Sequence, residues 1–319
     1  MMNSVKKLNE VNLAEEIDRM RREKNAVILA HFYQEGEVQD IADHTGDSLA
    51  LSRLAADTNA EIILFAGVHF MAETAKILSP EKKVLLPDLR AGCSMAESCP
   101  ADQFEEFIRK NPGRTVVTYV NTTAKVKTLS DIICTSGNAV RVVESLPKGE
   151  KIIFAPDRNL GEYVREKTGR DMLIWKGSCH VHVRFSAEKI LDLKKKYHEA
   201  KIIAHPECES SVRKLAEFLG STSQLIKFTE KDKGKMYIVA TEPGVIYEMR
   251  KINPEKKYIP APPEERVSCD CSECEYMKMI TLEKIYNTLK YELPEIKLDK
   301  EIIERAVVPI RRMLEITAG

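Results

Sequence analysis

The sequence predicts an α/β protein built from three repeats, each with a parallel sheet covered by helices. In three segments a His or Tyr lies 17 residues before a Ser or Thr; the pairs are His31 and Ser48, Tyr119 and Ser136, and His205 and Thr222. An apolar strand at 62–66 also has counterparts at 152–155 and 237–240, which gives a period of about 86 residues. Self-similarity on this scale usually determines the architecture.

Composition places the chain among globular proteins. It has 319 residues, 43% of them hydrophobic, and can bury a substantial core. Acidic and basic residues both number 49, so no net field favours nucleic acid or an anionic membrane. The N-terminal segment is charged rather than apolar, and the longest apolar runs have the length of strands. We therefore expect a cytoplasmic protein with no nucleic-acid or membrane partner.

The first repeat begins with a helix and continues in the order βαβαβ. Asn12 and Glu15 are typical of a helix start, and apolar residues at helical spacing follow. Residues 26–30 form a short, continuously apolar strand, as expected for a parallel sheet with helices on both faces. His31 stands at the carboxyl end of this strand. The repeat is completed by a helix at 48–57, a strand at 62–66, a helix at 72–78 and a strand at 84–86.

The other two repeats follow the same plan. The second has a helix at 102–110, a strand at 115–120, a helix after Ser136 and strands near 152 and 172. The third has a helix from 186, a strand at 201–204, a helix after Thr222 and strands near 237 and 258. Two amphipathic helices, at 277–291 and 300–316, lie outside the repeats. We expect domains at 1–97, 98–184 and 185–274, with 275–319 packing back on the first.

The strand ends predict one shared site. In open α/β sheets ligands bind beyond the carboxyl ends of the strands, and the paired His, Tyr, Ser and Thr residues all map to that edge. If the three edges face inward around a pseudo-threefold axis, they enclose a central cavity. Each Ser or Thr also stands at a predicted helix start, where unpaired amides attract anions. Ordinary helix capping is the alternative for each of them taken singly.

The cysteines indicate a metal centre. Eight cysteines are too few for a disulfide scaffold in a chain of this length. Cys93 and Cys179 lie 86 residues apart, and the third repeat offers Cys269, Cys271 or Cys274. One thiolate from each repeat suits a cubane iron-sulfur cluster that leaves one iron open as a Lewis acid. The CxxC spacing in the third repeat could instead bind zinc or form a redox disulfide. The cysteines without counterparts are expected to be inert; they are Cys99, Cys134 and Cys208.

One carboxylate stands out among the strand-end residues. Glu207 lies two residues after His205, and the two can act as an acid/base pair. His180 and His182 closely follow Cys179 but have no counterpart in the other repeats. We expect them either to support the cysteine or to lie in a loop.

Nine motifs run in order along nearly the whole chain. They are His31-Phe32-Tyr33-Gln34, Gly46-Asp47-Ser48, Ala91-Gly92-Cys93-Ser94, Tyr119-Val120-Asn121-Thr122, Thr135-Ser136-Gly137-Asn138, Pro156-Asp157-Arg158-Asn159-Leu160-Gly161, residues 175–182, His205-Pro206-Glu207-Cys208 and Tyr276-Met277-Lys278-Met279. Together they resemble the quinolinate synthetase A family. The resemblance implies three homologous three-layer α/β/α domains around a central site with a [4Fe-4S] cluster. It also implies that Cys93, Cys179 and Cys274 hold this cluster, and that Cys271 and Cys274 form a redox-sensitive pair.

The same resemblance implies an enzyme of NAD biosynthesis. Such a transferase condenses iminoaspartate with dihydroxyacetone phosphate and releases phosphate and water to give quinolinate; an aspartate oxidase or dehydrogenase supplies the iminoaspartate. The implied substrate contacts are His31, Ser48, Tyr119, Asn121, Ser136, His205, Glu207 and Thr222. We expect Glu207 with His205 to act as general base, and Tyr33 or Tyr119 as acid or orienting group.

Two other functions remain open at this point. An iron-sulfur hydro-lyase would use the same open iron on a hydroxy acid without forming a carbon-carbon bond. A zinc- or redox-switched binding protein would instead be built around the third repeat's cysteines, Cys269, Cys271 and Cys274.

Overall fold

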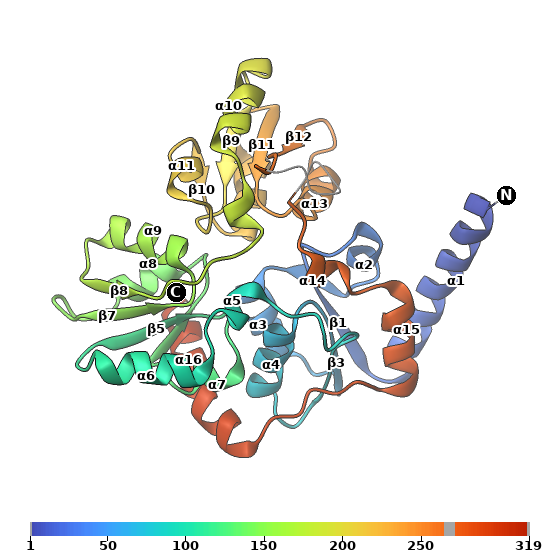
Figure 1. The fold of residues 1–319 in the computed structure, drawn as a ribbon. Helices are drawn as coiled ribbons and strands as arrows, with labels where there is room; N and C mark the ends of the chain where they lie inside the picture. Colours follow the sequence, from blue (N-terminus) through green and yellow to red (C-terminus); the bar gives the residue numbers. More distant parts are fainter. Residues whose placement is uncertain (1, 265–271, 318–319) are drawn as a thin grey trace. The chain divides into compact units, whose positions relative to one another are not determined.

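The computed structural model describes residues 2–264 and 272–317 of the chain. Within these ranges it contains three sheets of four parallel strands, flanked by helices (Figure 1). The chain divides into two compact units. We call Met1–Cys93 with Glu275–Val307 the smaller unit, and Ser94–Cys274 with Val308–Gly319 the larger unit. No helix among the described residues is both long enough and apolar enough to span a membrane.

All three sheets have the same topology. The strand orders are β2-β1-β3-β4, β6-β5-β7-β8 and β10-β9-β11-β12, and every neighbouring pair is parallel. Identical order in three sheets is what three copies of one supersecondary unit produce. The predicted α/β class and the three parallel sheets are therefore confirmed. The pseudo-threefold arrangement and the predicted domain bounds stay predictions.

The smaller unit contains the first sheet. Its elements are α1 (Met2–Glu23), β1 (Ala26–His31), α2 (Gly36–Asp40), β2 (His44–Gly46), α3 (Ser48–Asp57), β3 (Ile62–Ala66), α4 (His69–Leu78), β4 (Lys83–Leu85), α14 (Glu275–Lys278) and α15 (Leu282–Tyr291). Every residue of β1 and β3 is buried, which explains why both read as unbroken apolar runs. Each buried Leu or Ile in them contributes about 1.5–3 kcal/mol relative to an exposed one.

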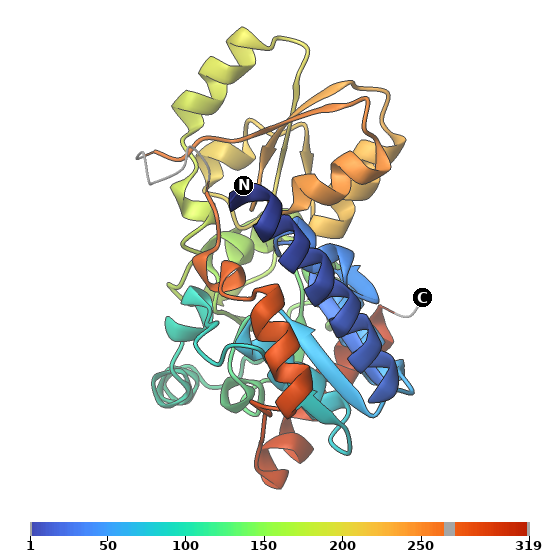
Figure 2. The same cartoon turned by 90° about the vertical axis from the view of Figure 1, so that its right-hand side faces the viewer.

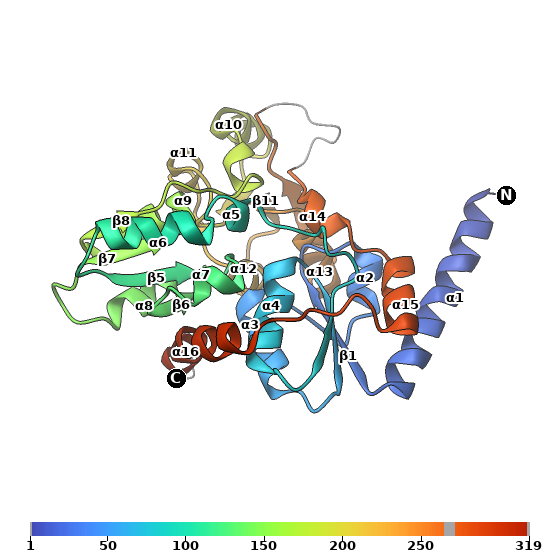
Figure 3. The ribbon, with the colours of Figure 1, turned by 60° about the horizontal axis from the view of Figure 1, so that its bottom comes forward.

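Helices cover both faces of this sheet. Figure 3 shows α3 and α4 on one side of β1, with α1 and α15 on the other. In Figure 2 α15 runs beside α1, and the two helices are in contact. The segment after residue 275 thus packs on the first sheet through α15.

The first helix begins earlier than predicted. The prediction that Asn12 caps the helix is wrong, because α1 already starts at Met2 and Asn12 lies inside it. The preceding residues contain neither Gly nor Pro, so nothing in them stops the helix from extending toward the N-terminus.

The larger unit contains the other two sheets. The second repeat is α5 (Ser94–Glu97), α6 (Ala101–Lys110), β5 (Thr115–Tyr119), α7 (Ala124–Lys127), β6 (Ile132–Cys134), α8 (Ala139–Glu144), β7 (Ile152–Ala155), α9 (Arg158–Thr168) and β8 (Met172–Ile174). The third is η1 (His182–Arg184), α10 (Ala187–Lys196), β9 (Lys201–Ala204), α11 (Ser210–Arg213), β10 (Phe218–Leu219), α12 (Thr222–Lys231), β11 (Met236–Ala240), α13 (Val245–Ile252) and β12 (Lys257–Pro260). The last helix, α16 (Lys300–Ile316), runs across the division between the units.

Each sheet has one strand more than the predicted βαβαβ order. The additional strands are the edge strands β2, β6 and β10, each of only two or three residues. Runs this short carry no hydrophobic period, and only pairing with the neighbouring strand defines them. Each edge strand also leads into the candidate site, because it ends two or three residues before the candidate hydroxyl side chain of Ser48, Ser136 or Thr222.

Close packing of α9 on its sheet depends on one glycine. A methyl group at Gly161 would lie 2.8 Å from Ile174 Cγ2 and 2.9 Å from Phe154 Cδ1. We expect Gly161→Ala to lower the free energy of unfolding by about 1–3 kcal/mol, because a well-packed core has no room for another carbon. Urea denaturation would measure this. Arg165→Ala on the exposed side of the same helix is the control, and equal stability of the two variants would contradict the prediction.

Candidate functional site

The carboxyl ends of β5 and β9 bring two candidate residues together in the larger unit. Tyr119 is the last residue of β5, and Glu207 follows β9 by three residues. The Tyr119 hydroxyl donates a hydrogen bond to Glu207 Oε1 at 2.5 Å, and both side chains are buried. This hydrogen bond therefore joins two residues that lie 88 positions apart in the sequence.

His182 contacts the other oxygen of Glu207. Its Nδ1 lies 2.9 Å from Glu207 Oε2 and 3.2 Å from Cys179 Sγ, while its Nε2 lies 3.0 Å from Thr241 Oγ1. The ring also stacks on His205, with the centroids 4.6 Å apart. His182 thus joins the candidate base to a candidate metal ligand. The contact with Cys179 matches the first of the two roles expected for His182, support of the cysteine. Its contact with Glu207 was not expected, because His182 has no counterpart in the other repeats.

His205 connects Glu207 to the second repeat. Its Nδ1 lies 3.7 Å from Glu207 Oε1, and its Nε2 lies 3.1 Å from Ser136 Oγ. Asn159 holds the Glu207 backbone from the other side, because its Nδ2 donates to the Glu207 carbonyl at 3.0 Å. The carboxylate is therefore oriented through both its side chain and its main chain.

The surroundings keep Glu207 ionised. Burial acts to raise its pKa, but the charges of His205 and His182 and the hydrogen bonds from His182 and Tyr119 outweigh burial and lower the pKa below its usual range. The neighbouring Asp157 behaves in the opposite way. Burial and the charge of Glu207 raise the pKa of Asp157 well above its usual range. Two nearby carboxyl groups with opposite shifts are typical of a site that handles protons.

Two buried carboxyl groups hold the backbones of two candidate thiolate ligands. Asp157 Oδ2 accepts a hydrogen bond from the Cys179 N–H at 3.1 Å, and Glu242 Oε1 accepts one from the Cys274 N–H at 3.4 Å. Asp157 follows β7 by two residues, and Glu242 follows β11 by two. They are 85 residues apart, the same offset as their strands, so extending the repeat alignment by two residues would have identified both. The first repeat has Val68 at this place.

In the smaller unit, the candidate residues His31 and Tyr33 lie at the carboxyl end of a strand. His31 is buried at the end of β1, and its ring lies edge-on to Tyr33 with centroids 4.4 Å apart. The Tyr33 N–H donates to His31 Nδ1 at 3.1 Å. Lys278 Nζ donates to the Tyr33 carbonyl at 2.9 Å, so α14 helps to hold this loop. Cys93, which is half-buried, is the last residue of this unit's first segment.

Helix capping is carried out by the residues before two of the candidate hydroxyls. Asp47 caps α3 by accepting from the Ala50 N–H, so Ser48 is the first helical residue. Ser221 caps α12 in a capping box with Gln224, so Thr222 again comes next. Capping therefore does not account for the hydroxyls of Ser48 and Thr222. Ser136 precedes the N-cap residue of α8 and instead meets His205.

Asn121 presents an acceptor toward the interior. Among the described residues its Oδ1 is buried and has no hydrogen-bond partner. A buried acceptor left unsatisfied costs about 1–3 kcal/mol, which a bound donor would recover. Its position two residues after β5 places it at the same sheet edge as Tyr119.

The remaining cysteines have a different environment. Burial raises the pKa of Cys99 to about 12, and it raises the pKa of Cys134 and of Cys208 as well. Thiols that resist ionisation are poor ligands and nucleophiles. Cys269 and Cys271 lie outside the described residues.

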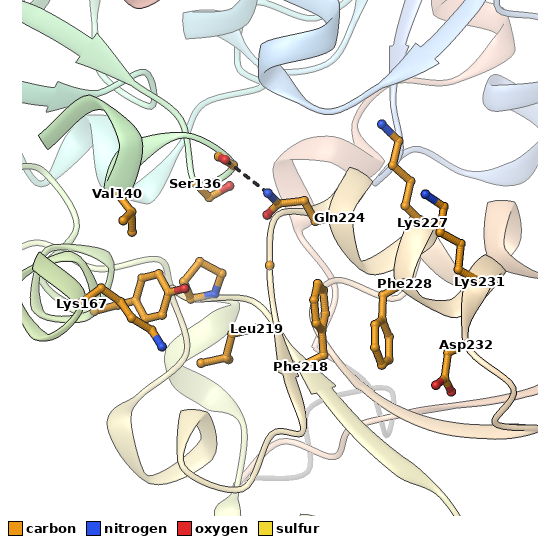
Figure 4. Close-up of a pocket in the computed structure, with 14 residues that line it drawn as sticks. Ser136, Val140, Lys167, Phe218, Leu219, Gln224, Lys227, Phe228, Lys231 and Asp232 are labelled. Carbon is orange, nitrogen blue, oxygen red and sulfur yellow. Dashed lines mark hydrogen bonds between the residues drawn. The ribbon is translucent and has the colours of Figure 1, made fainter. Parts of the chain in front are cut away.

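A cavity of about 640 Å³ adjoins the site in the larger unit (Figure 4). Ser136 lies on one wall, and the stacked rings of Phe218 and Phe228, 4.3 Å apart, lie on the opposite side. Gln224 Nε2 donates to the Gly137 carbonyl at 3.3 Å and joins the second and third repeats across it. The cavity is lined by three lysines, Lys167, Lys227 and Lys231. Ser136, which contacts His205, also lines this cavity.

The buried group also has the donors for a metal ion. One ligand atom each from Cys179, His182 and Glu207 lie within 4.8 Å of one another. Thiolate, imidazole and carboxylate are the side chains that bind transition metals in proteins.

Comparison with known proteins shows the family of this chain. The family model described as quinolinate synthetase A protein matches residues 15–315. A quinolinate synthase of Synechocystis sp. is 56% identical over 298 residues, which cover 93% of this chain and 93% of the relative. A quinolinate synthase of Thermosynechococcus vestitus is 53% identical over 307 residues, covering 96% of each chain. The match takes in both compact units and all three sheets, and the chain therefore belongs to the quinolinate synthetase A family.

Proposed function

We propose that this protein is a quinolinate synthase that condenses iminoaspartate with dihydroxyacetone phosphate, releasing phosphate and water. The observation that carries the proposal is the buried Glu207 carboxyl group, held between Tyr119 and His182 beside Cys179 in a chain of this family. Both substrates are anions, and the protein has no net charge, so local groups must bind them. The proposal includes a place in cytoplasmic NAD biosynthesis, downstream of an aspartate oxidase or dehydrogenase.

The cofactor we propose is a [4Fe-4S] cluster held by Cys93, Cys179 and Cys274. The residues fit such a group. The three repeats each contribute one thiol, and buried carboxyl groups hold the backbones of two of them. Cys93 and Cys274 are half-buried, and Cys179 is buried. When bound, the cluster would supply one iron with an open position as a Lewis acid.

Glu207 is the proposed general base. It is ionised, and its Oε1 already shares a proton with the Tyr119 hydroxyl, so a proton taken from substrate can pass to or from the tyrosine. His205 supports the same oxygen and links it to Ser136. Tyr33, beside His31 in the smaller unit, is the alternative acid.

The remaining candidates would bind the substrate anions. His31, Ser48, Asn121, Ser136 and Thr222 all lie at carboxyl ends of strands or at the helix starts that follow. Hydroxyl and imidazole groups there, together with helix N-termini, suit carboxylate and phosphate oxygens. The buried oxygen of Asn121 would accept from the substrate's nitrogen or hydroxyl group.

An anaerobic preparation tests the proposal in two measurements. We expect about four irons with labile sulfide per chain, and quinolinate formed from iminoaspartate and dihydroxyacetone phosphate. Dehydration of a hydroxy acid without triose phosphate would identify a hydro-lyase instead. One zinc and no sulfide would identify a zinc-binding protein.

The carboxyl group behind Cys179 should control how well the cluster is retained. Asp157 accepts hydrogen bonds from the backbone N–H groups of Cys179 and Leu160, one on each carboxyl oxygen. The amide of Asp157→Asn has only one oxygen, so its NH₂ group would face one of these two N–H groups and leave it without an acceptor. We expect iron loss to a chelator about 10- to 100-fold faster than in the wild type, the usual cost of losing an outer-shell partner. The chelation rate, followed by the decay of cluster absorbance, measures this effect.

Asp171→Asn is the matched control, because that carboxylate is exposed and pairs with Arg114 at the surface. Glu242→Gln should resemble Asp157→Asn, since it loosens Cys274 in the same way. Iron retention equal to that of the control in both variants would show that the carboxyl groups do not support the ligands.

A further inference from the structure

The larger unit contains a set of metal-binding atoms that differs from the three cysteines of the proposed cluster. Cys179 Sγ and Glu207 Oε2 lie 3.2 Å and 2.9 Å from the same atom, His182 Nδ1. Ligand atoms of one zinc ion, bound at about 2.0–2.3 Å each, lie at comparable separations from one another. All three side chains are buried, so no long, mobile ligand has to be recruited from the surface.

The chemistry of this set favours a single borderline-soft ion. One thiolate, one imidazole and one carboxylate are typical zinc ligands, and three protein ligands with an open fourth position are typical of non-structural zinc sites. An iron-sulfur cluster, in contrast, takes its ligands from thiolates. Only Cys179 belongs to both sets, so the two occupants exclude each other.

The surrounding contacts orient all three ligands before any metal arrives. Thr241 and the stacked His205 ring hold His182 with Nδ1 toward the other two ligands. Asp157 holds the backbone of Cys179, and Asn159 holds that of Glu207. Such outer contacts raise metal affinity by reducing the reorganisation that binding requires.

We propose that the cluster-free protein binds one divalent transition metal ion, of the Zn²⁺ type, through Cys179 Sγ, His182 Nδ1 and a Glu207 carboxylate oxygen, and that this ion blocks cluster assembly. Binding displaces two protons to solvent, that of the Cys179 thiol and the Nδ1 proton that His182 donates to Glu207, and no electron is transferred. The ion site follows from the geometry of the three side chains. Only the effect on assembly rests on the proposed function.

Cobalt is the probe for this site. The full-length, cluster-free chain is titrated with Co²⁺ under anaerobic conditions. We expect one Co²⁺ per chain, a thiolate-to-cobalt charge-transfer band, and displacement of cobalt by Zn²⁺. His182→Asn should weaken Co²⁺ binding about tenfold or more, whereas His180→Asn, the matched control, should leave it unchanged. Equal binding by the two variants would overturn the proposal. Circular dichroism verifies folding, and Glu207→Gln replaces His182→Asn if the latter does not fold.

Cysteine variants separate this proposal from the cluster proposal. Cys93→Ser and Cys274→Ser should lose the cluster on reconstitution yet keep the cobalt band, whereas Cys179→Ser should lose both. Loss of the cobalt band in either of the first two would overturn the single-ion site and leave the cluster proposal standing. Retention of the full cluster in all three variants would refute the proposed cluster ligands and would not affect the proposed single-ion site.

The effect on assembly has its own measurement. The Zn²⁺-loaded chain should take up no iron and sulfide until a chelator removes the zinc, and His182→Asn should assemble its cluster equally well with and without added Zn²⁺. Equal assembly rates for zinc-loaded and metal-free wild-type protein would overturn the proposed block.

Discussion

Glu207→Gln should lower the turnover number for quinolinate formation by about 10²- to 10⁴-fold while the cluster content stays unchanged. General acid-base groups typically contribute this much, and the amide cannot take up a proton. The amide is nearly the same size and still accepts the Tyr119 hydrogen bond, so the packing around position 207 is kept. The assay compares initial rates at saturating substrate, with iron and sulfide measured on the same samples.

The pH dependence adds a second readout for Glu207. The two histidines and Tyr119 hold the pKa of Glu207 below its ordinary value of 4.5. Its ionised form is therefore already complete at neutral pH, and is lost only as the pH falls through the lowered value. We expect no loss of wild-type activity from this group between about pH 6 and pH 8.

Glu209→Gln provides the matched control, because Glu209 lies two residues away and forms a half-exposed ion pair with Arg158. This variant should retain nearly the full rate. A Glu207→Gln enzyme with an intact cluster and the rate of its control would remove Glu207 from the proton chemistry.

Cys179→Ser should abolish both cluster and activity. Iron should fall from about four per chain to near zero, because a serine hydroxyl does not replace a thiolate as ligand to iron and sulfide. The substitution removes little volume, and the Asp157 contact is to the backbone, so the fold should persist. Anaerobic reconstitution followed by iron, sulfide and optical analysis measures the loss.

Two internal controls accompany this experiment. Cys99→Ser and Cys134→Ser change thiols whose burial raises their pKa values, and both should keep the cluster. Each is expected to lose some stability, since a hydroxyl replaces a sulfur in the core. Full iron content in Cys179→Ser would show that this cysteine is not a ligand.

Much of the fold follows from local sequence. β1 and β3 are short, apolar along their whole length and flanked by helical patterns, and such strands occur in parallel sheets buried on both faces. The 85- to 89-residue offsets then imply three sheets of one kind. The edge strands β2, β6 and β10 could not be found in the same way, because their two or three residues become strands only by pairing with a neighbour.

The residues of the candidate site, like the strands, could be predicted only in part. Tyr119, Ser136 and Glu207 could be placed from the sequence, since the carboxyl end of a strand is a property of the strand itself. The contacts of His182 could not, because this residue has no repeat counterpart, and Glu207 and Thr241 lie far from it along the chain and meet it only in the folded protein.

The sequence by itself determined that three sheets carry reactive groups at their carboxyl ends, with at least one thiol in each repeat. That follows from periodicity, which records local structure and duplication. Only the tertiary structure decided which of these groups touch, and which buried carboxyl groups hold the backbones of Cys179 and Cys274. Such contacts join residues about 20 to 90 positions apart. They depend on how whole elements pack, so no local pattern encodes them.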